Sequence, residues 1–219
     1  MQEPTDIKGV QQLIGRLAAL SRFISRLGER TLPFYQLLRK GEKFEWTLET
    51  RNAFADLKKT LSTPPILAVP KEREQLYLYI AARSNIVSTA LVVERAEEGK
   101  VQSIQRPIYY LSMLLTKSQQ RYPHYQKLVY AIIMTSRKVS HYFDEHSITI
   151  VSSAPLADIL NNPGATGRVA EWNIELSPRD LQFKHPTTIK AQVLPYFLVE
   201  WTEVQTPAPR PVQLMGNVL

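Results

Sequence analysis

Cysteine, a leader-like apolar stretch and a membrane-length hydrophobic run are all missing from this sequence. None of the 219 residues is cysteine, which excludes a disulfide framework and cysteine-ligated zinc, and suits a reducing compartment. The first ten residues, MQEPTDIKGV, lack the apolar core of a signal peptide. The longest apolar run, Leu128–Met134, lies between Lys127 and Arg137 and is far shorter than the roughly 18 residues of a membrane span. With 44% hydrophobic residues, the chain can bury one large core or two small ones.

Acidic residues are outnumbered, most unevenly near the start of the chain. There are 20 acidic and 27 basic residues, which gives a net charge of +7. The segment Ile7–Lys43 contains two acids, Glu29 and Glu42. A basic helical segment is the electrostatic footprint of a protein that binds a phosphate backbone, but a solvated cationic helix face has the same composition. The eight basic residues of this segment are Lys8, Arg16, Arg22, Arg26, Arg30, Arg39, Lys40 and Lys43.

The middle of the chain shows the pattern of a small antiparallel sheet followed by a long helix. In Leu76–Glu94 (LYLYIAARSNIVSTALVVE), large and β-branched residues flank the polar Arg83-Ser84-Asn85, which predicts a two-strand hairpin. A third strand is predicted over Gln102–Ser112. Thr116-x-x-Gln119 then has the spacing of a capping box, and a helix is predicted over about Tyr125–Phe143.

Three helices are predicted before this hairpin. Apolar residues of Ile7–Leu27 recur at the spacing of one helical face, and Gly28 stands where a C-terminal cap belongs. A second helix is predicted from about Thr31 to Arg39, with proline in its first turn. The third is predicted over Leu48–Leu61 with Thr47 as its N-cap, and Ser62-Thr63-Pro64-Pro65 marks a domain boundary.

After the long helix, strand and helix patterns alternate. The predicted elements are a strand over Ser147–Ser152, helices over Ala154–Leu160 and Arg168–Leu176, a strand over Leu181–Lys184 and a last helix over Ile189–Val199. The order from Leu76, βββαβααβα, indicates an α/β domain with a mixed sheet, preceded here by a small helical segment. The proline-rich stretch after Trp201 is expected to be disordered.

Several stretches resemble the C-terminal part of a known polymerase family. DIKGVQQLIGRLAALSRFISRLGERTLPFYQLLRKGEKFEW and AFADLKKTLSTPPIL resemble the thumb of gypsy-type LTR-retrotransposon reverse transcriptases. LYLYIAARSNIVSTALV, RPIYYLSMLL, RYPHYQKLVYAII and RVAEWNIELSPRDLQFKHPTTIKAQVLPYFLVEW resemble their RNase H-like domain, in the degenerate tether or connection form of plant elements. The resemblance implies a thumb-like segment over residues 1–65, an RNase H-like domain with a five-stranded mixed sheet and flanking helices over 66–201, and a tail over 202–219. No Tyr-x-Asp-Asp motif occurs, so the polymerase fingers and palm are expected to lie outside this chain or to be lost.

The carboxylates on which the family's RNase H activity depends are not found at the matching positions. RNase H cleaves the RNA strand of an RNA–DNA hybrid with two divalent ions held by Asp and Glu. The resemblance places these acids at Ala81, Leu128, Ser153 and Tyr196, and an acid sometimes found two residues earlier at Gln126. No Asp or Glu occurs within residues 76–93 or 108–139, so a slip in the alignment restores neither of the first two. We therefore expect no catalytic residue, no bound metal and no other cofactor, although the family uses Mg²⁺. The remaining acids, expected to be ordinary surface residues, are Asp144, Glu145, Asp158, Glu171, Glu175 and Asp180.

Three interpretations of function follow from this resemblance. The favoured one is a non-catalytic, nucleic-acid-binding tether of a reverse transcriptase, in which Arg16, Arg22 and Arg26 contact the phosphates of an RNA–DNA hybrid or DNA duplex. Arg22 and Arg26 are four apart and would share one helix face. The alternatives are an active RNase H with two divalent metals, and a non-functional retroelement remnant or domesticated protein-binding scaffold. The implied partners are nucleic acid and the rest of a retroelement polyprotein, not a membrane; the implied location is intracellular, in a cytoplasmic particle or the nucleus.

Overall fold

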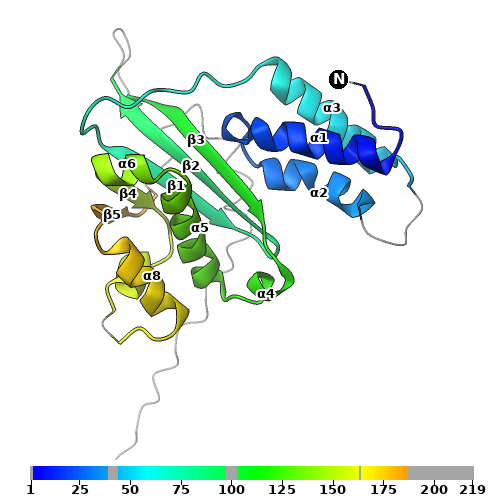
Figure 1. Ribbon diagram of the computed structural model, residues 1–219. Coiled ribbons are helices and arrows are strands. Elements are labelled where there is room, and N and C mark those ends of the chain that lie inside the picture. Colours follow the sequence, from blue (N-terminus) through cyan, green and yellow to red (C-terminus); the bar gives the residue numbers. More distant parts are fainter. Residues whose placement is uncertain (1, 39–43, 97–102, 163, 187–219) are drawn as a thin grey trace, which may run out of the picture.

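The structure, a computed structural model, describes residues 2–38, 44–96, 103–162 and 164–186. These residues form a group of helices that lies beside a sheet with helices packed on it (Figure 1). The helical unit consists of α1 (Ile7–Ala19), the 3₁₀ turn η1 (Ser21–Phe23), α2 (Leu27–Leu37) and α3 (Leu48–Ser62). The sheet part consists of β1 (Leu76–Ala82), β2 (Ile86–Arg95), β3 (Ile104–Leu114), α4 (Lys117–Gln120), α5 (His124–Lys138), α6 (Ser140–Glu145), β4 (Ile148–Val151), α7 (Leu156–Leu160), α8 (Arg168–Leu176) and β5 (Leu181–Lys184).

The five strands are ordered β3-β2-β1-β4-β5 in one mixed sheet. β1, β2 and β3 are antiparallel neighbours, whereas β4 runs parallel to β1 and β5 runs parallel to β4. The register pairs Leu78 with Leu91 on one side and with Ile150 on the other. β4 is short, rich in β-branched residues and buried along its whole length, as a strand inside a sheet must be. The predicted α/β fold with a mixed five-stranded sheet is confirmed.

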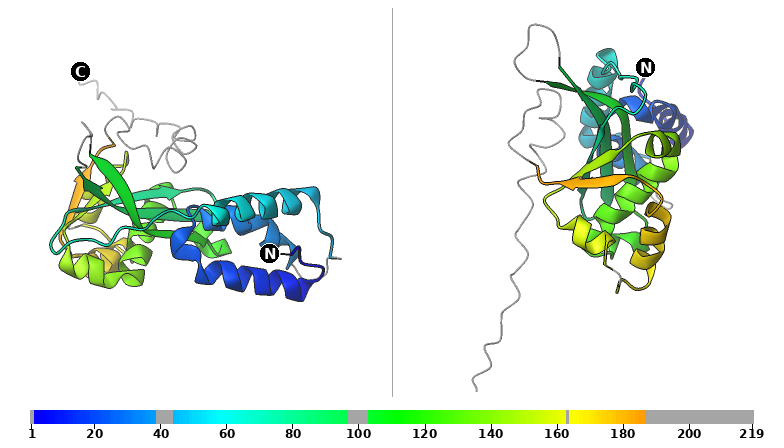
Figure 2. Two further views of the ribbon diagram at one scale, coloured as in Figure 1. Left: turned by 90° about the horizontal axis from the view of Figure 1, so that it is seen from above. Right: turned by 90° about the vertical axis from the view of Figure 1, so that its left-hand side faces the viewer.

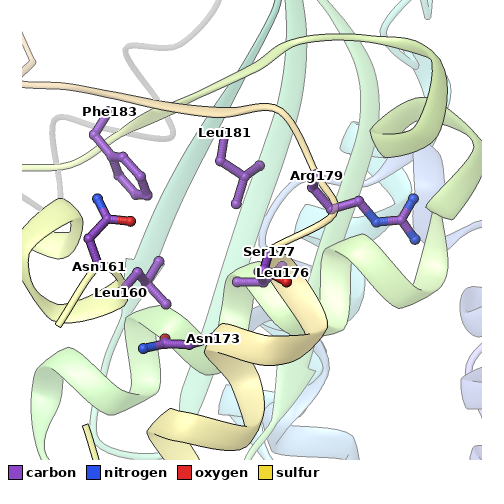
Figure 3. A pocket seen from close by; sticks show the side chains of 8 residues that line it. All are labelled: Leu160, Asn161, Asn173, Leu176, Ser177, Arg179, Leu181 and Phe183. Atoms are coloured by element: carbon purple, nitrogen blue, oxygen red, sulfur yellow. The ribbon is translucent and has the colours of Figure 1, made fainter. Parts of the chain in front are cut away.

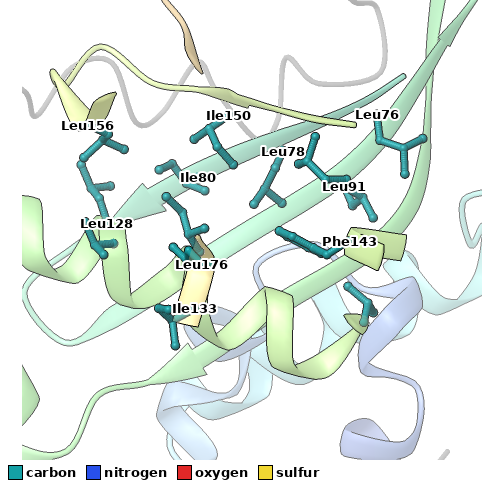
Figure 4. Close-up of a cluster of buried hydrophobic side chains, with 14 of the residues drawn as sticks. Leu76, Leu78, Ile80, Leu91, Leu128, Ile133, Phe143, Ile150, Leu156 and Leu176 are labelled. Atoms are coloured by element: carbon teal, nitrogen blue, oxygen red, sulfur yellow. The ribbon is translucent and has the colours of Figure 1, made fainter. Parts of the chain in front are cut away.

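The main core lies between the sheet and the helices on one of its faces. Side chains alternate along a strand, so Leu76, Leu78 and Ile80 of β1 all point to that face, where they meet α5 (Figure 4). Leu78 and Ile132 have no exposed surface, at 0% each, and each such side chain contributes about 1.5–3 kcal/mol to folding. Four residues within the range of the predicted long helix are buried: Leu128, Ile132, Thr135 and Val139.

The helix predicted over Tyr125–Phe143 is divided into two, which corrects that prediction. α5 ends at Lys138, and Val139 adopts φ −129° and ψ 46°, outside the helical region, before α6 begins at Ser140. Val139 is β-branched and therefore a weak helix former, and its side chain is buried in the core. The break redirects the chain toward β4.

The continuous helix predicted over Ile7–Leu27 is also wrong. α1 ends at Ala19, η1 follows, and Arg26 adopts a left-handed conformation with φ 56° before α2 begins at Leu27. Gly28 is not a C-cap but lies in the first turn of α2, and the second helix therefore starts earlier than the predicted Thr31. The apolar residues of Ile7–Leu27 have the spacing of a single helix face although the helix is interrupted. The reason is that α1 and the residues after it bury their apolar side chains in the same core, where Leu17 and Ile24 are each 1% exposed.

The chain turns at this point because the helical unit docks against the sheet. η1 and α2 contact β3, and Figure 2 shows the helical unit extending past one end of the sheet. The Gly28 N–H donates to Ser112 Oγ at 3.0 Å, and Ser112 Oγ lies 2.7 Å from Ser88 Oγ. A Cβ at Gly28 would lie 2.9 Å from Ser112 Oγ, so a larger residue here would displace the Ser112 hydroxyl from its hydrogen bond to the Gly28 N–H.

Two predicted caps are confirmed. Thr47 caps α3, its Oγ1 accepting from the Thr50 N–H at 3.2 Å, and Thr116 with Gln119 forms a capping box. That capping box begins the short α4 rather than α5. The helix predicted over Ile189–Val199 and the tail over 202–219 lie outside the described residues. None of the helices that the structure describes combines the length and apolarity needed to cross a bilayer.

Candidate nucleic-acid interface

Two of the positions matched to the family carboxylates are buried. Ala81 is paired with Ser88 inside β1–β2 and is 7% exposed. Strand alternation puts Ala81 on the sheet face that carries Tyr77 and Tyr79, opposite the main core. Leu128 is 3% exposed and belongs to the main core, where it lies beside Leu156 (Figure 4). Neither side chain offers an oxygen to a cation.

The third matched position follows β4. Ser153 lies in the bend between β4 and α7, next to Ser152, whose Oγ accepts from the Ala154 N–H at 3.1 Å. Both residues carry hydroxyls, so a shift of one position places no carboxylate at the end of this strand. The fourth matched position, Tyr196, lies outside the described residues.

A lysine stands where α5 meets the β1–β2 turn. Lys127 precedes Leu128, is 7% exposed, and donates from Nζ to the Ser84 backbone oxygen at 2.9 Å. A fixed ammonium on the residue next to Leu128 disfavours a divalent cation close by, because like charges repel strongly where water is scarce. A pair of Mg²⁺ ions needs several hard oxygen ligands, and the residues present do not fit that requirement.

The acids elsewhere in the sheet part do not rebuild a metal site among the described residues. No group of three or more His, Cys, Asp or Glu in the described ranges is placed to hold a metal ion. Asp144 pairs with Arg179. Glu175 accepts two hydrogen bonds from Arg137, at 2.7 and 2.6 Å, and these lower the pKa of the Glu175 carboxyl. Asp144 and Glu175 thus neutralise neighbouring arginines and are not free to coordinate metal.

A pocket between α7, α8 and β5 also lacks catalytic groups (Figure 3). Its wall includes Asn173, whose buried Oδ1 has no hydrogen-bond partner among the described residues. Apart from Arg179, the side chains around it are uncharged, which gives no general acid, base or metal ligand. The lining residues are Leu160, Asn161, Asn173, Leu176, Ser177, Arg179, Leu181 and Phe183.

The arginines predicted to contact nucleic acid fall into different environments. Arg16 is exposed on α1. Arg22 is exposed in η1, with its guanidinium carbon 5.4 Å from the Phe23 ring centroid and 5.8 Å from that of Tyr109. Arg26 donates from Nε to Glu29 Oε2 at 2.8 Å and is half-buried. Because α1 ends at Ala19, Arg22 and Arg26 do not share a helix face, and that part of the prediction is wrong.

Ion pairs neutralise two basic residues of this segment, Arg26 and Arg30, and two arginines outside it, Arg51 and Arg83. Arg30 pairs with Asp56, and Arg51 pairs with Glu3. Glu29 lies between Arg26 and Arg83, 3.5 Å from the Arg83 Nε, so this acid also links the helical unit to the β1–β2 turn. A charge count cannot reveal these pairs, because most of their members are far apart in the sequence.

One face of α1 keeps its polar groups open to solvent. Val10, Leu13 and Leu17 are buried, and Lys8, Gln12 and Arg16 follow one another at four-residue spacing on the exposed side. Beside them lie the exposed Gln11 and Gly15, and a Cβ at Gly15 would meet nothing within 4 Å. Within the described residues, Lys8, Arg16 and Arg22 have no carboxylate partner. We call Lys8, Gln11, Gln12, Gly15 and Arg16 the basic face of α1; it is open to an anionic, extended partner. The two glutamines were not singled out from the sequence, although their spacing relative to the buried residues places them on this exposed face.

Comparison with known proteins finds a matching family over the last helix of the helical unit and most of the sheet. Residues 46–150 match the model of the RNase H-like domain found in reverse transcriptase. The chain is similar to the Gag-Pol polyprotein of feline leukemia virus, with 27% identity over 160 residues, 73% of this chain and 9% of that polyprotein. It is also similar to the Tf2-3 transposon polyprotein of Schizosaccharomyces pombe, with 26% identity over 191 residues, 84% of this chain and 14% of that polyprotein. The chain thus spans a small part of the length of these relatives.

Solved structures share the fold. The foamy viral protease-reverse transcriptase in complex with double-stranded DNA superposes with a TM-score of 0.66, at 17% identity, over 86% of this chain and 33% of that chain. A structure of the foamy viral protease-reverse transcriptase in complex with RNA/DNA hybrid gives a TM-score of 0.65 at 18% identity, over 86% of this chain and 26% of that chain. The resemblance to reverse transcriptases and their RNase H-like domain is confirmed; the gypsy-type and plant-element details stay predictions.

Proposed function

We propose that this chain, which is similar to retroviral and retrotransposon polyproteins and matches the RNase H-like domain found in reverse transcriptase over residues 46–150, binds nucleic acid without cleaving it. In this proposal, residues 1–65 act as a thumb-like unit that contacts a duplex. Residues 66–201 act as an inert RNase H-like domain that sets the distance to the rest of a retroelement polyprotein. Thumb and sheet part would work as one piece, because Gly28, Ser88 and Ser112 join them closely.

The observation that carries the loss of cleavage is the surroundings of Ala81 and Leu128. The two-metal reaction needs negative oxygens around both ions, and a buried methyl group and a core leucine supply none. Restoring an acid at Leu128 would put a charge into packed hydrocarbon, which costs several kcal/mol unless the charge is paired. The change is therefore built into the core and is not confined to single side chains on a surface.

A cleavage assay tests this half of the proposal. The full chain is incubated with a labelled RNA–DNA hybrid in Mg²⁺ and, separately, in Mn²⁺, beside an active RNase H as positive control. We expect no cut RNA beyond the level of a no-protein control. Metal-dependent cleavage that persists through repeated purification would overturn the proposal in favour of an active enzyme.

The basic face of α1 supports the binding half of the proposal. Its cations have no acid beside them within the described residues, and Gly15 leaves the helix backbone open to close approach by a groove of the duplex. The similar foamy viral protein has been captured on DNA and on RNA/DNA hybrid, which makes a duplex the natural probe. We assign phosphate contacts to Arg16 and Arg22. The sequence adds Arg26 to these contacts, but we propose instead that it acts through Glu29 to hold α2 against the sheet.

Binding is measured with a fluorescent hybrid duplex at several salt concentrations. The double variant Arg16→Glu, Arg22→Glu should bind more weakly and with a shallower salt dependence, by about 1 unit of logarithmic slope for each phosphate that the variant no longer binds. The control is Lys59→Glu, Lys71→Glu, which makes the same change in net charge at exposed positions outside α1 and η1. Equal binding by both double variants, or no binding by the unaltered chain at low salt, would remove the thumb role.

A further inference from the structure

A second exposed arginine rests on aromatic rings, far from α1 in the sequence. The guanidinium carbon of Arg168, the first residue of α8, lies 4.3 Å from the Tyr122 ring centroid and 5.9 Å from that of Trp172. Tyr122 and Trp172 pack against each other with centroids 6.2 Å apart, and both contact Tyr130. The Tyr130 hydroxyl accepts from Gln119 Nε2 at 2.8 Å, which ties α4 to the cluster. The rings therefore form a fixed platform under one side of the guanidinium.

Arg168 of α8 keeps its charge unpaired within the described residues, whereas the charge of Arg137, on the neighbouring α5, is neutralised by a carboxylate. Arg137 of α5 makes a bidentate pair with Glu175 of α8. Within the described residues, Arg168 makes no ion pair, and its side chain is exposed. The acid in the first turn of α8, Glu171, is exposed and does not pair with it. The cluster orders Arg168 without using its hydrogen-bond donors.

The surroundings of Arg168 are basic. α4, the start of α5 and the start of α8 meet at one end of the sheet part (Figure 1). Lys117 of α4 and Arg121 beside Tyr122 are exposed and make no ion pair in the described part of the chain. The sequence holds no Asp or Glu between Glu98 and Asp144, so α4 and α5 supply no negative charge on this side.

We infer that Lys117, Arg121 and Arg168 form a second nucleic-acid contact surface, in which Arg168 binds a backbone phosphate of the duplex. An arginine stacked on rings keeps its planar N–H edge available for bidentate binding of phosphate, and its mobility is already restricted before the ligand arrives. The inference rests on the proposed function, since it takes the same duplex as ligand. It extends the contact from the helical unit to the RNase H-like domain.

The test uses Arg168→Gln in the full chain, measured on the hybrid duplex across a salt series. Removing the charge that binds one phosphate should weaken binding about fivefold near physiological salt and reduce the logarithmic salt slope by about 1. Arg137→Gln is the matched control, because it removes the same charge from the same helix pair at a site that Glu175 neutralises, and it should not reduce the slope. Arg168→Lys keeps the charge but not the planar stack and should fall between Arg168→Gln and the unaltered chain.

The outcomes separate the two proposals. If Arg168→Gln binds like Arg137→Gln while Arg16→Glu, Arg22→Glu still binds weakly, the second surface is wrong and the thumb contact stands. If the unaltered chain binds no duplex, both fail. Thermal unfolding is measured in parallel; should Arg168→Gln not fold, Arg121→Glu decides, because Arg121 makes no ring contact within the described residues and its reversal must still weaken binding. Unchanged binding by Arg121→Glu would overturn the inference.

Discussion

The meeting point of β1 with α5 and the exposed face of α1 differ in what surrounds their key side chains. At the first, Leu128 and its neighbours are closed off from water, and the cation that is present, Lys127, is held by the Ser84 carbonyl. At the second, Arg16 faces solvent and has no acid beside it within the described residues. Catalysis by metal needs ligands fixed at a dry centre, whereas phosphate binding needs only accessible charge. A chain can therefore lose the first without losing the second.

Replacing Leu128 by glutamate tests whether the buried position can accept a carboxylate, and it should have the largest effect. Leu128→Glu should destabilise the fold by about 3 kcal/mol or more, because it removes core packing and buries a carboxylate. Urea denaturation measures the change, and Mg²⁺ should not restore the stability. Gln126→Glu, two residues away at a half-buried position, serves as control and should cost about 0.5 kcal/mol at most. A stable Leu128→Glu protein whose melting temperature rises with Mg²⁺ would contradict this prediction, because it would show that a carboxylate at position 128 is enough to create a metal site.

Two glycine-to-alanine substitutions compare a glycine packed against the sheet, Gly28, with one that faces open space, Gly15. Gly28→Ala should destabilise by about 1–3 kcal/mol, because the added Cβ meets Ser112 Oγ at 2.9 Å. Gly15→Ala meets nothing within 4 Å and should stabilise α1 by up to about 1 kcal/mol. Thermal unfolding compares the two variants. If both behave alike, the helical unit does not dock on the sheet as described.

Arg22 and Arg26, four residues apart, are expected to differ in role: Arg26 contributes to stability and Arg22 to duplex binding. Arg26→Gln should cost about 1 kcal/mol, since it leaves the half-buried Glu29 carboxylate with only Arg83 nearby. Arg22→Gln should leave stability within about 0.5 kcal/mol of the original and weaken duplex binding about fivefold. Parallel denaturation and binding curves check both. The reverse pattern would return Arg26 to the phosphate contacts predicted from the sequence.

The smallest expected effect is a pH dependence within the sheet part. Hydrogen bonds from Arg95 lower the pKa of Glu74 from 4.5 to about 2. Because the folded pKa is the lower one, the stabilisation is complete above pH 4.5 and is lost as the pH falls toward 2. Its size should stay below about 1 kcal/mol, as for other ion pairs near the surface. Arg95→Gln should flatten the stability profile in this window, and an unchanged profile would contradict the assignment.

Much of the fold could be predicted because local patterns carry it. The hairpin of β1 and β2, the β-branched β4 and the Thr47 cap follow from neighbouring residues, and all appear in the structure. The break at Val139 and the end of α1 at Ala19 were missed, since packing against distant elements decides them and leaves the apolar spacing unchanged. Arg26 is the predicted phosphate contact to which we now assign a different role, because it pairs with Glu29, which also pairs with Arg83. The sequence alone did not indicate this group of three charges.

By itself, the sequence determined the order of the five strands along the chain and the absence of Asp and Glu from residues 76–93 and 108–139, because composition and strand patterns are fixed along the chain. Only the tertiary structure decided which arginines keep their charge available. Arg137 meets Glu175 and Arg26 meets Glu29, whereas Arg168 lies on Tyr122 and Trp172. Whether a cation is neutralised or merely supported depends on which side chains folding brings within a few ångströms of it, and for Arg137 and Arg168 those partners include residues of other elements.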